Sequence, residues 1–215
     1  MKKKVSDKLF EYVTNFFFQD FSPKFRVDKL KNLMDFFYVI FEKISIEFEI
    51  LYSNYINMYE ELVEKELNLL NIKKDDKILV IGCGSLPATS ILIAQKTNNS
   101  VHCIDIDKKA ISKARFLTKK IGIKNMSFDA VDGISSKVDD YDIIFLLYGV
   151  KKQKEMINYL SSNMKNNSYI IFRTTEESLH NQVGGEYFLE QYFKIKGKVE
   201  SENIYLNISY LLKKE

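Results

Sequence analysis

The sequence is poor in the residues on which several classes of protein depend. Its 215 residues include two cysteines, two histidines, two prolines and no tryptophan. Two cysteines are too few for a disulfide framework. Together with two histidines they do not predict a zinc cluster, so we expect no metal. We interpret Cys83 as a small residue in a turn, with a reactive thiol as the alternative, and Cys103 as part of a strand core.

Strong charge and long apolar runs are also missing. The net charge of +3 is too small to favour nucleic acid or an anionic membrane as a partner. No apolar run reaches the roughly 18 residues that a membrane-spanning helix needs. The segment LFEYVTNFFFQDF is interrupted by Glu11 and Asp20 and lacks a signal-peptide cleavage site. We therefore expect a cytoplasmic protein that binds neither nucleic acid nor membrane.

Glycine is absent before Gly82, and Pro23 is the one proline in that part of the chain. Apolar residues there recur at helical spacing, which predicts an all-helical extension over residues 1–72. Its last helix, over residues 54–70, carries Tyr55, Tyr59 and Glu66 on one apolar stripe. Glu66 would either reach water at the edge of the stripe or face a ligand with the tyrosines, since a buried carboxylate needs a partner.

From residue 73 to residue 215, predicted strands and helices alternate, which indicates an α/β domain with a parallel sheet. The stretch KILVIGCGSLPATS begins it: the apolar strand Ile78–Ile81 leads into a glycine turn and then a helix. Further strands are predicted over residues 101–105, 125–131, 141–149 and 168–174. Two tail strands, within residues 192–201 and 204–214, would form the antiparallel edge of a seven-stranded sheet.

The glycine turn is the strongest functional signal. Asp105 ends the second strand about 20 residues after the turn, a spacing that lets a carboxylate bind ribose hydroxyls. A structural turn without a ligand is the alternative. Leu86 and Pro87 stand where dinucleotide-binding proteins have a third glycine, so the backbone comes less close to a pyrophosphate. This favours a ligand without phosphates, such as S-adenosylmethionine.

In a parallel sheet, ligands lie at the carboxyl ends of the strands. There Asp105 would bind ribose and Ile106 would pack on adenine. Asp132 would accept from the adenine amino group or, equally, form a turn with Gly133. Tyr148 would orient the methionine arm or the nucleophile, or simply pack. The predicted nucleoside-binding residues are Gly82, Cys83, Gly84, Ser85, Leu86, Pro87, Asp105, Ile106, Asp132, Gly133, Leu147 and Tyr148.

These motifs resemble one family. GCGSLPATS is similar to the G-x-G-x-L-P-x-T-S loop of the nicotianamine synthases, a branch of the class I methyltransferase fold. IDID with Asp105, YDIIFLLYGV, and Arg173 in IIFRTT also match. The resemblance implies a Rossmann-like seven-stranded domain and transfer of the 3-amino-3-carboxypropyl arm of S-adenosylmethionine, which is consumed as a substrate. Bacterial opine-metallophore synthases and azetidine-2-carboxylate synthases look similar, which implies a role in metallophore biosynthesis.

The resemblance further implies a small amine or amino acid as acceptor and methylthioadenosine as the leaving nucleoside. Tyr148, Tyr55, Tyr59 and Glu66 are the candidate catalytic residues. Arg173 and Thr174 would bind substrate, although an ordinary surface ion pair is the simpler interpretation of Arg173. Other possibilities are methyl transfer to a small molecule, cyclisation of S-adenosylmethionine to azetidine-2-carboxylate, and binding without turnover. The aromatic-rich extension would form a lid or a homodimer surface.

Overall fold

The computed structural model describes residues 49–201 and 208–215. The chain divides into two units, with the boundary between Met58 and Tyr59. Helix α3, Glu49–Met58, is the described part of the first unit. The helices predicted before residue 49 lie outside the described residues, so the predicted boundary at residue 72 stays a prediction. The single helix predicted over residues 54–70 is wrong, because Tyr59 forms a turn between α3 and α4, Glu60–Asn68.

The second unit is built on a seven-stranded sheet in the order β3-β2-β1-β4-β5-β7-β6. The strands β1 to β5 run parallel, and β7 pairs antiparallel with both β5 and β6. The sheet confirms the predicted class I methyltransferase arrangement, including its antiparallel edge. Its strands are β1 (Ile78–Ile81), β2 (Val101–Asp105), β3 (Met126–Ala130), β4 (Ile143–Leu146), β5 (Tyr169–Thr174), β6 (Lys194–Glu200) and β7 (Ile208–Lys213).

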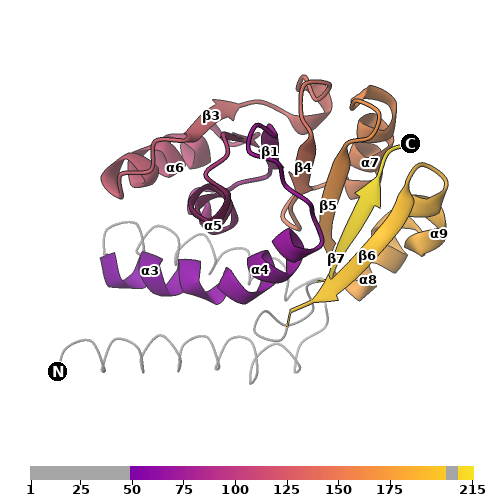
Figure 1. The fold of residues 1–215 in the computed structure, drawn as a ribbon, viewed down its shortest axis with the longest axis horizontal. Helices are drawn as coiled ribbons and strands as arrows, with labels where there is room; N and C mark the ends of the chain where they lie inside the picture. The colour runs from indigo at the N-terminus through magenta and orange to yellow at the C-terminus, as the bar shows by residue number, and fades with distance from the viewer. Residues whose placement is uncertain (1–48, 202–207) are drawn as a thin grey trace. The chain divides into compact units, whose positions relative to one another are not determined.

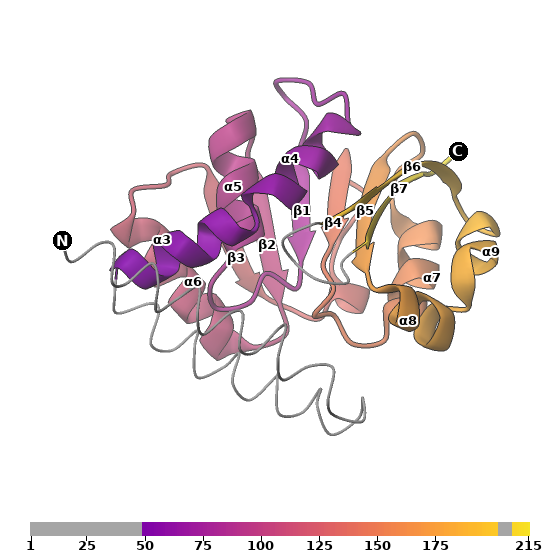
Figure 2. The same ribbon diagram turned by 90° about the horizontal axis from the view of Figure 1, so that it is seen from below.

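Helices cover both faces of this sheet (Figures 1 and 2). The first face carries α4, α5 (Ala88–Thr97) and α6 (Lys108–Lys120). The opposite face carries α7 (Gln153–Asn163), α8 (Glu176–Ser178), the π-helical turn Leu179–Val183 and α9 (Gly185–Glu190). A short 3-10 turn, Gly133–Ser135, follows β3. Within the described residues, every helix is too short or too polar to cross a bilayer.

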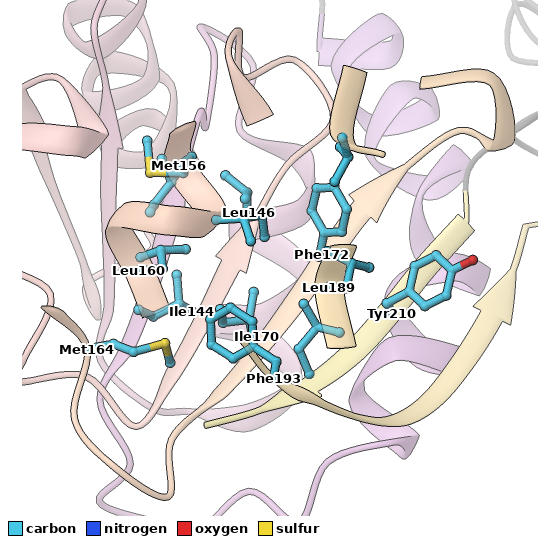
Figure 3. Packing of buried hydrophobic residues seen from close by; sticks show 14 of the residues in the cluster. Ile144, Leu146, Met156, Leu160, Met164, Ile170, Phe172, Leu189, Phe193 and Tyr210 are labelled. Carbon is cyan, nitrogen blue, oxygen red and sulfur yellow. The ribbon is translucent and has the colours of Figure 1, made fainter. Parts of the chain in front are cut away.

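A large apolar cluster of described residues lies between the sheet and α7 and α9. In Figure 3, Ile144 and Leu146 from β4 and Ile170 and Phe172 from β5 point toward the side chains of these helices. Phe172 is completely buried. Burial of each such side chain stabilises the fold by about 1.5–3 kcal/mol relative to exposure.

The same alternation sends the residues between them to the other face. Side chains along a strand point to opposite sides in turn, so Arg173 of β5 faces α4 and α5 while Phe172 faces α7. Ser209 of β7 pairs directly with Arg173 and shares its face. β1 and β4 are buried at every position, as the continuous apolar runs predicted. Arg173 and Ser209 are therefore polar residues on the same face of the sheet.

Candidate nucleoside-binding site

The glycine turn lies at the carboxyl end of β1, as predicted. Gly82 donates its N–H to the Ile104 carbonyl at 2.8 Å, which ties the turn to β2. Its φ of +82° suits glycine, and a Cβ there would lie 2.5 Å from a methyl carbon of Val150. Gly84 also has a positive φ of 68°. The positive φ at both positions favours glycine, which has no Cβ.

Asp105 and the glycine turn are in direct contact. Asp105 Oδ2 accepts a hydrogen bond from the Gly84 N–H at 2.9 Å, and Oδ1 accepts one from the Asp107 N–H at 2.9 Å. The carboxylate is partly exposed, and each of its oxygens can still accept from a ligand hydroxyl. The predicted pairing of the turn with the spaced carboxylate is therefore present in the geometry.

The apolar residues around the turn differ in exposure. Cys83 and Leu86 are buried, so their side chains pack inside the protein rather than face solvent. Ile106 follows Asp105 and is 71% exposed, which is unusual for an isoleucine and leaves its side chain free for a flat apolar ligand. Contact with the Cys103 thiol, and burial, raise the pKa of Cys83 well above its ordinary value. The protonated thiol fits the turn-residue interpretation and argues against a reactive cysteine.

Asp132 and Gly133 form the turn that the sequence offered as one alternative. Asp132 Oδ1 accepts from the Ile134 N–H at 3.2 Å and caps the 3-10 turn. A Cβ on Gly133 would meet the terminal methyl of Met156, which is the end of a flexible side chain, and would lie 3.0 Å from a methyl carbon of Ile81. Both residues thus have a structural role, and the predicted contact of Asp132 with adenine stays a prediction.

Tyr148 lies just beyond β4 and is 39% exposed. The residue before it, Leu147, is buried and donates its N–H to the Ile81 carbonyl at 3.2 Å, so this segment is fixed to the end of β1. Tyr148 therefore lies on a segment at the carboxyl edge of the sheet, and its predicted role at the site stays a prediction.

Gln153, which no sequence motif marked, holds this region together. It is 1% exposed, and its amide nitrogen donates to the carbonyls of Tyr148 and Arg173 at 3.3 and 3.4 Å. Its Oε1 accepts from the hydroxyls of Thr174 and Ser178 at 3.3 and 3.4 Å. Thr174 is fully buried, so its hydroxyl already has a protein partner, and its predicted contact with substrate stays a prediction.

Glu66 and Arg173 form a buried ion pair, which corrects both simpler expectations from the sequence. Glu66 does not reach water, and Arg173 is not a surface residue: their side chains are 0% and 3% exposed. The guanidinium donates from Nε to Glu66 Oε1 at 3.0 Å and from Nη2 to Oε2 at 2.7 Å. The Arg173 guanidinium carbon also lies 5.6 Å from the centre of the Tyr59 ring, a cation–π contact.

Tyr55 lies on α3 in the first unit. Its predicted catalytic role, like that of Tyr59, stays a prediction.

Comparison with known proteins agrees with this geometry. The family model described as nicotianamine synthase protein matches residues 46–193. L-Histidine 2-aminobutanoyltransferase of Yersinia pestis is 25% identical over 53% of this chain and 44% of its own. Nicotianamine synthase 2 of Arabidopsis thaliana is 31% identical over 56% of this chain and 42% of its own. The chain thus spans under half the length of these curated relatives.

Solved structures show the same fold. A crystal structure of MtNAS in complex with MTA and tNA superposes with a TM-score of 0.70 at 21% identity, over 81% of this chain and 69% of that one. A variant of MtNAS in complex with S-adenosylmethionine also gives a TM-score of 0.70, at 20% identity, over 82% of this chain and 71% of that one. Since the family model covers more than half of the sequence and includes the glycine turn, Asp105 and Arg173, the chain belongs to the nicotianamine synthase family.

Proposed function

We propose that this protein transfers the 3-amino-3-carboxypropyl group of S-adenosylmethionine to a small amine or amino acid and releases methylthioadenosine. The observation that carries the proposal is the contact of Asp105 with the glycine turn inside the segment that matches the family. The aminobutanoyltransferase relative and the MTA bound to MtNAS support the same chemistry.

The residues of the turn fit a nucleoside without phosphates. Asp105 accepts from the two ribose hydroxyls, while Ile106 offers an apolar surface to adenine. The backbone of Gly82–Pro87 lies beside the methionine arm. Because Leu86 is buried where a third glycine would allow close approach, the turn suits this ligand better than a dinucleotide. Asp132 and Gly133 complete the adenine side.

The reaction itself asks little of the protein. The amine nitrogen of the acceptor attacks the γ carbon of the methionine arm, the bond between that carbon and the sulfonium sulfur breaks, and its electron pair passes to sulfur, which becomes the neutral thioether of methylthioadenosine. The nitrogen then loses a proton. Alignment of the amine with that carbon supplies most of the acceleration. We assign to Tyr148, which is 39% exposed, the orientation of the amine or of the carboxylate of the arm.

Product analysis tests the proposal. Purified protein is incubated with S-adenosylmethionine alone and then with a panel of amino acids, and the products are identified by mass spectrometry. We expect methylthioadenosine and an acceptor that carries the aminocarboxypropyl group. Azetidine-2-carboxylate without any acceptor would mean that the arm's own amine is the nucleophile. S-Adenosylhomocysteine would instead show a methyltransferase and would overturn the proposal.

A cytoplasmic location, a homodimer, a reaction without metal and a role in metallophore biosynthesis remain predictions that accompany this proposal.

A further inference from the structure

The Glu66–Arg173 pair is a buried polar group for which the proposed reaction has no direct use. Both oxygens of the carboxylate accept from the guanidinium, and Ser209 donates its hydroxyl to Glu66 Oε1 as well. A carboxylate that is fully buried and bonded in this way is poorly placed to take a proton from an incoming amine. The bonding of Glu66 therefore favours a positioning role over its predicted role as a catalytic base.

Among the described residues, the guanidinium also contacts α5. Arg173 Nη1 donates to Thr89 Oγ1 at 3.0 Å, and Thr89 is the second residue of α5, directly after the glycine turn. One side chain on β5 thus joins α4, through Glu66, to the first turn of the helix that the glycine turn opens. Thr89 is itself 4% exposed.

The geometry of the Glu66–Arg173 ion pair fixes the orientation of the guanidinium. A planar guanidinium with two parallel bonds to a carboxylate has one favoured orientation. With that orientation set, Nη1 donates to Thr89 Oγ1, so the position of the helix start depends on the ion pair. A buried ion pair is weak evidence for stability, because desolvation offsets its attraction. A role in orienting the glycine turn would explain why this ion pair is buried despite the desolvation cost.

We propose that Glu66 and Arg173 are positioning residues that act through Thr89 to hold the glycine turn in the conformation that binds S-adenosylmethionine. This inference rests on the proposed function only in the choice of ligand. It predicts that loss of the Thr89 hydroxyl weakens binding of the nucleoside while the ion pair itself stays intact.

Thr89→Val tests this link, because valine keeps the shape of threonine and removes the hydroxyl. Thr118→Val is the matched control: Thr118 is also a buried helical threonine, but its hydroxyl bonds the Ala114 and Arg115 carbonyls of its own helix. Binding of S-adenosylmethionine and of methylthioadenosine is measured by calorimetry on the full chain, with thermal unfolding to show that each variant is folded.

We expect Thr89→Val to raise both dissociation constants about tenfold, the effect of losing one hydrogen bond to a charged group. Thr89→Ser, which keeps the hydroxyl, should restore them, and Thr118→Val should leave them unchanged. A folded Thr89→Val variant that binds like the wild type would overturn the inference. Wild-type protein that fails to bind S-adenosylmethionine would instead overturn the proposed function.

Glu66→Gln distinguishes positioning from proton transfer. A positioning residue predicts weaker binding, an increased KM for S-adenosylmethionine and an unchanged pH profile of kcat. It also predicts that Glu66→Gln and Thr89→Val together cost less than the sum of their separate effects, since both act through one guanidinium. Normal binding with a large loss of kcat and an altered pH profile would assign Glu66 to catalysis and contradict the inference.

Discussion

Asp105 is the residue whose replacement should affect nucleoside binding most. In Asp105→Asn the side chain keeps its shape but loses its charge, and its NH2 group must face a hydrogen-bond donor. In the free protein those donors are the N–H groups of Gly84 and Asp107, each at 2.9 Å. In the complex they also include the ribose hydroxyls. The variant therefore weakens the ligand contact and the turn together.

The size of the effect follows from these bonds. A hydrogen bond to a charged group contributes about 1.5–3 kcal/mol. Loss of the favourable ribose contacts should cost about 3 kcal/mol, which corresponds to a dissociation constant raised about 150-fold. The loss should be equal for S-adenosylmethionine and methylthioadenosine, because both carry the same ribose. Calorimetric titration of both ligands measures it.

Asp107→Asn is the matched control. Asp107 is an exposed carboxylate two residues further on that caps α6 by accepting from the Lys109 N–H at 2.8 Å, and asparagine caps a helix equally well. We expect its affinity to match the wild type. Equal affinities for Asp105→Asn and Asp107→Asn, with both proteins folded, would refute the assignment of Asp105 to ribose.

Three further predictions concern the turn, the phenol and the sheet. Gly82→Ala forces a Cβ to 2.5 Å from Val150 at a positive φ, so we expect about 1–2 kcal/mol of lost stability in denaturant titrations, together with weaker nucleoside binding. Tyr148→Phe should lower kcat and leave the unfolding temperature unchanged, and full activity would contradict a role for the hydroxyl. Burial raises the pKa of Asp142, but bonds from Lys165 and from a backbone N–H outweigh this and hold it below its ordinary 3.8. The wild type should therefore exceed Asp142→Asn in stability above that pH and lose the advantage as the pH falls below it, as denaturation at several pH values will show.

Much of the fold could be predicted from the sequence because the patterns that indicate its strands and turns are local. The apolar runs Ile78–Ile81 and Ile143–Leu146 have no polar face, which predicted central parallel strands. The glycine turn and Asp105 were found together because a ribose site needs them at a fixed spacing. The break between α3 and α4 at Tyr59 could not be predicted from the sequence, because the apolar spacing continues through Tyr59 and neither glycine nor proline is present there.

The buried polar contacts of the second unit depend on the tertiary structure, so they could not be predicted from the sequence. Glu66 and Arg173 are 107 residues apart, and only the packing of α4 on the sheet brings them together. Period-two alternation along β5 puts Arg173 on the other face of the sheet from Phe172. Because helices cover both faces of a parallel sheet, this pattern could have indicated that Arg173 is buried. Gln153 gave no signal, because a glutamine at the start of a helix is ordinarily exposed.

The most direct test of the proposed chemistry traces the S-methyl group. S-Adenosylmethionine with an isotope label in that methyl group is incubated with the protein and the acceptor found in the amino-acid panel, and the products are separated and weighed by mass spectrometry. Aminocarboxypropyl transfer predicts that all of the label stays on sulfur, in methylthioadenosine, and that the acceptor gains mass without it. Label in the acceptor, with S-adenosylhomocysteine as the nucleoside, would contradict that chemistry.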